Sequence, residues 1–210
     1  MIEITTMGAL IVTAVGIVLA TILLVITATK VFSRSHSKAS TIIPDKSSSI
    51  ITTSSSSSRS WKYDVFLSFR GEDTRKTFVD HLYFALEQHG ILTYKDDVTL
   101  DRGDTIGPSL LKAIEESEIA LVIFSEHFAD SSWCLDELSC IMKCHQEKRG
   151  QIVMPIFYNV DPSDVSDQIS QFGKAFAKHK NNNNKVVSWK KALVDASNMA
   201  GWEPKHVANG

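Results

Sequence analysis

The stretch "IALVIFSEHFADSSWCLDELSCIM", residues 119–142, joins an unbroken apolar run to a polar loop and then to a second segment rich in apolar residues. A short apolar run rich in β-prone residues predicts a strand that is buried on both faces. The segment from Ser131 onward predicts a helix, and Gly150 is placed to end it. The stretch therefore predicts a strand, a loop and a helix in succession.

The same alternation runs through residues 61–203. Strands are predicted at residues 63–69, 91–97, 119–125 and 151–160, and helices at residues 73–90, 108–117, 131–150, 172–179 and 186–200. Apolar strands that alternate with helices predict a parallel sheet covered on both faces. The expected fold class is α/β, a flavodoxin-like, doubly wound parallel sheet of five strands in the order 2-1-3-4-5. We expect the fifth strand to be a short edge strand, either after Tyr158 or beyond Trp202.

Ligands of such sheets bind beyond the carboxyl ends of the strands, near the point where the strand order reverses. Three polar loops are expected to meet there. They are "SFRGEDTR" (residues 68–75), "DDVTLDRGDT" (96–105) and "SEHFADSSWC" (125–134). Glu137 lies just inside the helix that leaves the third loop. Most glutamates on helices face water, so the residue type alone predicts a solvated side chain.

The N-terminal region differs in kind from the rest. Residues 8–28, "GALIVTAVGIVLATILLVITA", contain no charge and no proline, and about 20 apolar residues suffice to cross a bilayer as a helix. A cleaved signal peptide, the alternative, has a shorter apolar region after a basic stretch, whereas only Glu3 is charged here. Because Lys30, Arg34 and Lys38 follow the segment, the positive-inside rule predicts a single-pass membrane protein whose remaining chain is cytoplasmic.

The chain is accordingly divided into five parts. They are a short tail (1–7), a transmembrane helix (8–29), a flexible Ser-rich linker (30–60), a folded domain (61–203) and a C-terminal tail (204–210). The formal net charge of −2 argues against a nucleic-acid partner.

Three cysteines, Cys134, Cys140 and Cys144, lie on one predicted helix, which suits reduced thiols in the cytosol better than disulfides. Cys140 and Cys144 with His145 lack the second ligand pair of a zinc site, so no metal is expected.

Five segments, in this order, resemble the plant Toll/interleukin-1 receptor (TIR) domain family. They are "YDVFLSFRGEDTRKTF" (63–78), "LDRGDTIGPSLLKAIEES" (100–117), "SSWCLDELSCIM" (131–142), "IVMPIFYNVDPSDV" (152–165) and "SWKKALVDASNMAGW" (188–202). The resemblance covers the whole expected domain. It implies an NAD+ nucleosidase of the ADP-ribosyl cyclase type, which cleaves the nicotinamide–ribose bond in plant defence and cell-death signalling. The family's Trp-Cys-x-x-Glu stretch implies that Glu137 is the catalytic residue.

This chemistry is compatible with a single carboxylate. Nicotinamide on the ribose is a pyridinium and leaves as a neutral molecule, so no general acid is required, in contrast to the two carboxylates of ordinary glycosidases. Glu137 would hydrogen-bond the ribose hydroxyls and stabilise the positive charge that develops on the sugar. Asp136 points about 100° away around the helix and should not share this role.

The resemblance implies a substrate-binding set as well. It comprises Phe69, Arg70, Gly71 and Arg75 in the first loop, Arg102 in the second, and Ser131 and Trp133 beside Glu137. Each has a structural alternative: salt bridges of the arginines with Glu72 or Asp73, a helix cap for Ser131, and a core contact for Trp133. No Gly-x-Gly-x-x-Gly or Walker pattern is present, so NAD+ is expected as a substrate and no cofactor is expected.

Family members of this type associate through their TIR domains. The contact positions here are Asp80 and His81 on the first helix, and Ser170 where glycine is usual. An aspartate that faces its own copy across a two-fold interface repels it. These departures favour an alternative function, a non-catalytic adaptor or decoy that acts by TIR–TIR association.

Overall fold

Parallel strands form the centre of the fold in the computed structural model, which describes residues 2–36, 61–95, 107–147, 150–179 and 183–203. The strands are β1 (Tyr63–Phe69), β2 (Thr93–Lys95), β3 (Ser117–Phe124) and β4 (Ile152–Phe157). They pair in the order β2-β1-β3-β4, and all pairs are parallel. The predicted α/β class and the order of the first four strands are confirmed, and β1 has the predicted bounds.

The fifth strand is shorter than predicted. Within the described residues it is reduced to Trp202, which forms a parallel bridge with Ile156 at the β4 edge. The Trp202 amide donates to the Pro155 carbonyl over 3.0 Å, and the Trp202 carbonyl accepts from the Phe157 amide over 2.7 Å. Gly201 permits this approach, because a Cβ there would lie 2.6 Å from the Phe157 ring. The location beyond β4 agrees with the predicted order, and among the described residues a single bridge takes the place of the short fifth strand that was expected.

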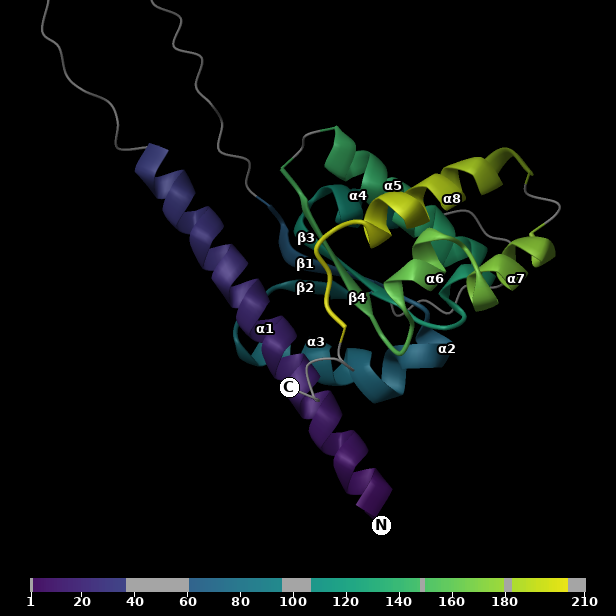
Figure 1. The fold of residues 1–210 in the computed structure, drawn as a ribbon. Coiled ribbons are helices and arrows are strands. Elements are labelled where there is room, and N and C mark those ends of the chain that lie inside the picture. Colours follow the sequence, from purple (N-terminus) through teal and green to yellow (C-terminus); the bar gives the residue numbers. More distant parts are fainter. Residues whose placement is uncertain (1, 37–60, 96–106, 148–149, 180–182, 204–210) are drawn as a thin grey trace, which may run out of the picture.

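Helices fill the connections between the strands (Figure 1). The module contains α2 (Gly71–Thr74), the π-helical turn η1 (Arg75–Val79), α3 (Asp80–Gln88), α4 (Pro108–Glu115), the 3-10 turn η2 (Phe128–Asp130), α5 (Ser132–Gln146), α6 (Pro162–Ser166), α7 (Ser170–Lys178) and α8 (Asn183–Ser197). The predicted helix 73–90 is thus interrupted by a wider turn, and α6 was not predicted. Gly90 has a positive φ just after α3, as expected of a residue that ends a helix. Gly150 also has a positive φ, but α5 ends earlier than predicted, at Gln146.

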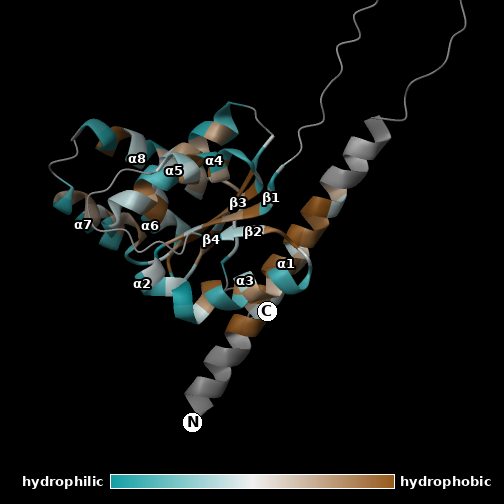
Figure 2. Cartoon of the chain, turned by 180° about the vertical axis from the view of Figure 1, so that it is seen from behind, coloured by the Kyte–Doolittle hydropathy of each residue, from teal (hydrophilic) through white to brown (hydrophobic). Residues whose placement is uncertain are grey.

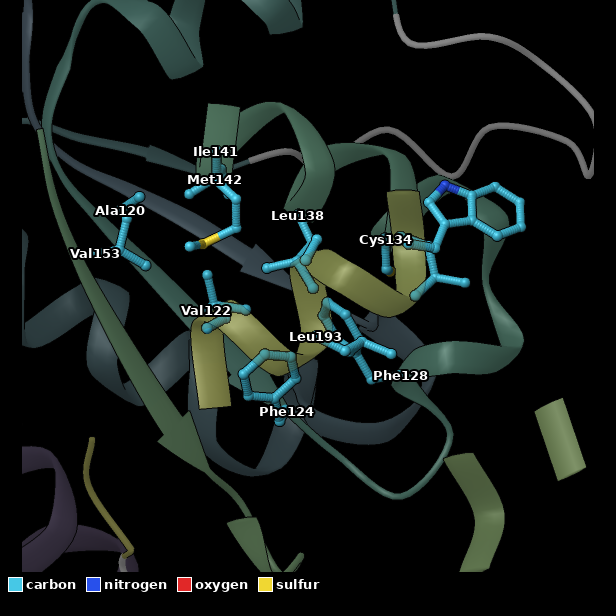
Figure 3. Packing of buried hydrophobic residues seen from close by; sticks show 14 of the residues in the cluster. Ala120, Val122, Phe124, Phe128, Cys134, Leu138, Ile141, Met142, Val153 and Leu193 are labelled. Atoms are coloured by element: carbon cyan, nitrogen blue, oxygen red, sulfur yellow. The ribbon is translucent and has the colours of Figure 1, made fainter. Parts of the chain in front are cut away.

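The side chains of the strands divide between two apolar layers. Phe66 belongs to a cluster with α4, α5 and α8, whereas its neighbours Val65 and Leu67 belong to a cluster with α3. Figure 3 shows the first cluster, in which Leu138 and Met142 of α5 are gathered with side chains of β3, β4 and α8. Burial on both faces explains why the strands are apolar without interruption.

An apolar helix, α1 (Ile2–His36), precedes the module and crosses α3 in contact with it (Figures 1 and 2). Its window Ile11–Ala28 has a mean hydropathy of 2.7, long and apolar enough to cross a membrane. Val18 and Ile22 are nevertheless buried in the α3 cluster, whereas Val12 and Leu24 are 73% and 70% exposed. The helix extends beyond the predicted span of 8–29 into the predicted linker.

Candidate active site

Glu137 is buried at the carboxyl end of the sheet, with only 3% of its surface exposed. The Ser68 hydroxyl of β1 donates a hydrogen bond to Oε2 over 2.8 Å. The indole Nε1–H of Trp133, one turn earlier on α5, donates to Oε1 over 2.7 Å. Both carboxylate oxygens are therefore held by donors, which is what a buried carboxyl group requires. The solvated position expected from the residue type alone is wrong.

Asp136, the neighbouring acid, faces a different element. Its Oδ2 accepts from Lys185 Nζ over 2.8 Å and its Oδ1 accepts from Trp189 Nε1, also over 2.8 Å. Both partners belong to α8, so Asp136 connects two helices of the module. The side chains of Asp136 and Glu137 diverge around α5, as their helical spacing predicts.

The beginning of α5 is held by two further contacts. The Ser131 hydroxyl accepts from the Cys134 amide over 3.3 Å, so the capping alternative for Ser131 is observed. The Cys134 thiol lies 3.6 Å from the Phe69 carbonyl, to which it donates. Burial, assisted by the nearby Glu137 carboxylate, raises the pKa of Cys134 to about 12. Cys134 is therefore a packed thiol at neutral pH.

The loop after β1 gathers four of the predicted substrate-binding residues. Arg70 pairs with both Glu72 and Asp73, which is the salt-bridge alternative. The Arg75 guanidinium lies 5.2 Å from the centre of the Phe69 ring, within the range of a cation–π contact. Gly71 lies against Arg75, because a Cβ at Gly71 would be 3.0 Å from Arg75 Nη2.

Asp73 joins this loop to the loop after β3. Its Oδ2 accepts from the Ser125 hydroxyl over 2.6 Å and from the His127 amide over 3.1 Å, in addition to the Arg70 pair. The two loops were predicted to meet from the strand order, and Asp73 connects them together with the contact between Cys134 and the Phe69 carbonyl.

The sequence pattern described as "TIR domain" matches residues 62–209. The chain belongs to the TIR domain family. Its curated relatives include Disease resistance protein RUN1 of Vitis rotundifolia, 55% identical over 147 residues, and TMV resistance protein N of Nicotiana glutinosa, 53% identical over 149 residues. Each match covers 69% of this chain, but only 11% and 13% of the respective relative.

A solved structure agrees with the fold. The TIR domains in the structure of the activated Roq1 resistosome, which directly recognises the pathogen effector XopQ, are 48% identical to this chain with a TM-score of 0.65. The match covers 70% of this chain and 91% of that chain.

The remaining predicted site residues lie in different parts of the TIR domain. Arg102 lies outside the residues that the structure describes. Asp80 and His81 are exposed on α3, where Asp80 pairs with Lys95 over 3.1 Å and His81 lies next to residues of α1. Ser170 is exposed at the start of α7, on the α5 side of the sheet, with φ of 50°. The proposed self-association residues therefore belong to two different surfaces, and the positive φ explains why glycine suits position 170.

Ser68 and Asp73 are the site residues that sequence reasoning missed. The signal for Ser68 is a hydroxyl within a strand whose neighbours, Leu67 and Phe69, are buried and apolar. Asp73 carried no comparable signal, because its partners lie 52 and 54 residues away.

Proposed function

We propose that this TIR domain cleaves the nicotinamide–ribose bond of NAD+, with Glu137 as the catalytic carboxylate, in plant defence and cell-death signalling. The observation that carries the proposal is the buried Glu137 carboxylate, held by Ser68 and Trp133 at the strand ends where α/β sheets bind ligands. Relatives named as disease resistance proteins support the biological role.

The reaction needs few protein groups. As the bond from ribose C1′ to the pyridinium nitrogen breaks, its electron pair stays with nitrogen and nicotinamide leaves neutral. The positive charge moves to the ribose, where the Glu137 carboxylate stabilises it. Addition of water to C1′ with loss of a proton yields ADP-ribose, and attack by a nucleophile within the same molecule yields a cyclic product.

The surroundings of Glu137 define how the substrate would enter. An ionised carboxylate accepts about four hydrogen bonds, so ribose hydroxyls can bind while Ser68 and Trp133 keep theirs. The half-buried Trp133 ring lies one helical turn from Glu137 and would stack against the substrate while its N–H keeps the bond to Oε1. Arg70 would exchange Glu72 or Asp73 for a phosphate, and Arg75 with Phe69 would line the same approach.

Release of nicotinamide from NAD+ by the purified full chain in detergent micelles tests the proposal. Glu137→Gln should abolish release, because the neutral amide does not stabilise the ribose cation. Asp136→Asn is the matched control, since it makes the same change one residue earlier on α5, and it should retain activity. Equal rates for wild type and Glu137→Gln would contradict the proposal.

TIR–TIR association without catalysis is the second candidate function. Asp80 pairs with Lys95 over 3.1 Å, which reduces the charge repulsion expected between two copies. The match to TIR domains of a resistosome favours association as well. Sedimentation of the full chain would test this function. If the wild type and Glu137→Gln associate equally well and the wild type releases no nicotinamide, the protein acts as an adaptor.

Membrane attachment through α1 completes the proposal, with the TIR domain in the cytoplasm. The hydropathy of Ile11–Ala28 supports it. A spanning α1 would have to leave the cluster in which Val18 and Ile22 are buried, because lipid and α3 compete for the same side of the helix. Resistance to alkaline carbonate extraction, with the TIR domain digested by protease added to the cytoplasmic side, is the expected result. Release of the chain by carbonate would instead support the packed arrangement.

A further inference from the structure

Ser68 is a polar residue in a position where the strand calls for an apolar one. It is fully buried, and Leu67 and Phe69 on either side are buried as well. Its backbone is fixed in the middle of the sheet, because Ser68 is in register with Val122 of β3. Its hydroxyl donates to Glu137 Oε2 over 2.8 Å, across 69 residues of chain. A hydroxyl has one proton to donate, and Ser68 donates it to Oε2. This bond therefore fixes the orientation of the carboxylate group.

Ser68 and Trp133, which both donate to the Glu137 carboxylate, lie on different elements of the fold. Trp133 lies on α5, four residues before Glu137, and would move together with it. Ser68 lies on β1 and directly precedes Phe69 and Arg70, which begin the loop of predicted substrate-binding residues. The hydrogen bond from Ser68 therefore ties the carboxylate itself to the strand that leads into this loop, whereas the Cys134 thiol ties the start of α5 to it.

We propose that Ser68 is a positioning residue, which holds the Glu137 carboxylate at the distance and angle that the ribose requires. The proposal rests on the function proposed above. Misplacement of a catalytic group by about 1 Å can reduce a rate roughly 10²-fold, and a hydrogen bond to a charged group is strong enough to prevent it. Ser68 does not itself touch the substrate in this role.

The chain offers a matched control in Ser117. Ser117 is also fully buried in a strand, and its hydroxyl donates to the Ala113 carbonyl over 2.6 Å. It pairs with Tyr63 at the other end of β1, far along the sheet from Ser68. Ser68→Ala and Ser117→Ala thus remove the same group from equally buried sites, but only one of them touches Glu137.

Nicotinamide release by the full chain in detergent micelles, measured over a range of NAD+ concentrations, tests the proposal. Ser68→Ala should lower kcat about tenfold to a hundredfold, with KM changed less than about twofold because substrate contacts are kept. Ser117→Ala should keep the wild-type kcat. Ser68→Cys, which preserves the volume but has a weak donor, should resemble Ser68→Ala, and Ser68→Thr should restore most of kcat because it keeps the hydroxyl.

The outcomes separate the two proposals. If wild type releases nicotinamide and Glu137→Gln does not, a wild-type kcat in Ser68→Ala or Ser68→Cys overturns the positioning role alone. A raised KM with unchanged kcat in Ser68→Ala also overturns it, because Ser68 would then act in binding. Equal release by wild type and Glu137→Gln overturns the proposed function, and the positioning role with it.

Discussion

Two sides of α5 carry neighbouring acids that are used differently. On one side, Glu137 faces the end of β1, where it accepts from a serine hydroxyl and an indole. On the other, Asp136 faces α8, where it accepts from Lys185 and Trp189. The contrast shows that a carboxylate acquires its role from the element it faces, since both acids lie in the same helical turn. Asp136 joins two helices, whereas Glu137 joins α5 to the sheet.

The rate at which the Cys134 thiol is alkylated tests whether solvent reaches the Glu137 side of α5. With a pKa of about 12, Cys134 should react with iodoacetamide at pH 8 roughly 10³-fold more slowly than an ordinary exposed thiol. Mass spectrometry of labelled peptides over time would measure this rate. Urea should restore normal labelling, and rapid labelling of the native chain would show that this side is open.

Moving each carboxylate by one methylene group compares the two positions directly. Glu137→Asp keeps the charge but withdraws the carboxylate from Ser68 and Trp133, so kcat for nicotinamide release should fall roughly 10²-fold. Asp136→Glu, the reciprocal change, should leave kcat near the wild-type value. A comparable loss in both variants would mean that Asp136 also serves the reaction.

Removing the Asp136 carboxylate should affect stability. In Asp136→Ala the Trp189 indole N–H loses its acceptor in a residue that is fully buried. We expect the free energy of unfolding in urea to fall by about 1–3 kcal/mol. Trp189→Phe, which removes the donor instead, is the companion variant. Unchanged stability in both would show that the contact with α8 contributes little.

The Ser131 cap stabilises the start of α5 as a whole, and its removal should have the smallest effect of these changes. Ser131→Ala removes the acceptor for the Cys134 amide, which should lower the free energy of unfolding by about 1 kcal/mol. Thermal unfolding would detect it. A loss of activity far beyond the loss of stability would instead assign Ser131 to the substrate.

Much of the fold could be predicted because the sequence patterns that specify strands and helices extend over only a few neighbouring residues. β1 has the predicted bounds, and α4 begins at Pro108 as expected of a residue suited to the first turn of a helix. The alternation of strands and helices predicted the parallel sheet, and the flavodoxin-like architecture gave the order of its first four strands. The π-helical turn at Arg75–Val79 could not be predicted, because it depends on how this segment packs.

The sequence by itself determined the apolar strands, the helices between them and the position of Glu137 near the start of α5, since periodicity and capping act over a few residues. Only the tertiary structure decided that Ser68 meets Glu137, that Asp73 connects two loops and that α1 packs against α3. These contacts join residues distant in the chain, and a pattern of neighbouring residues does not specify which distant partner a buried polar or apolar group finds.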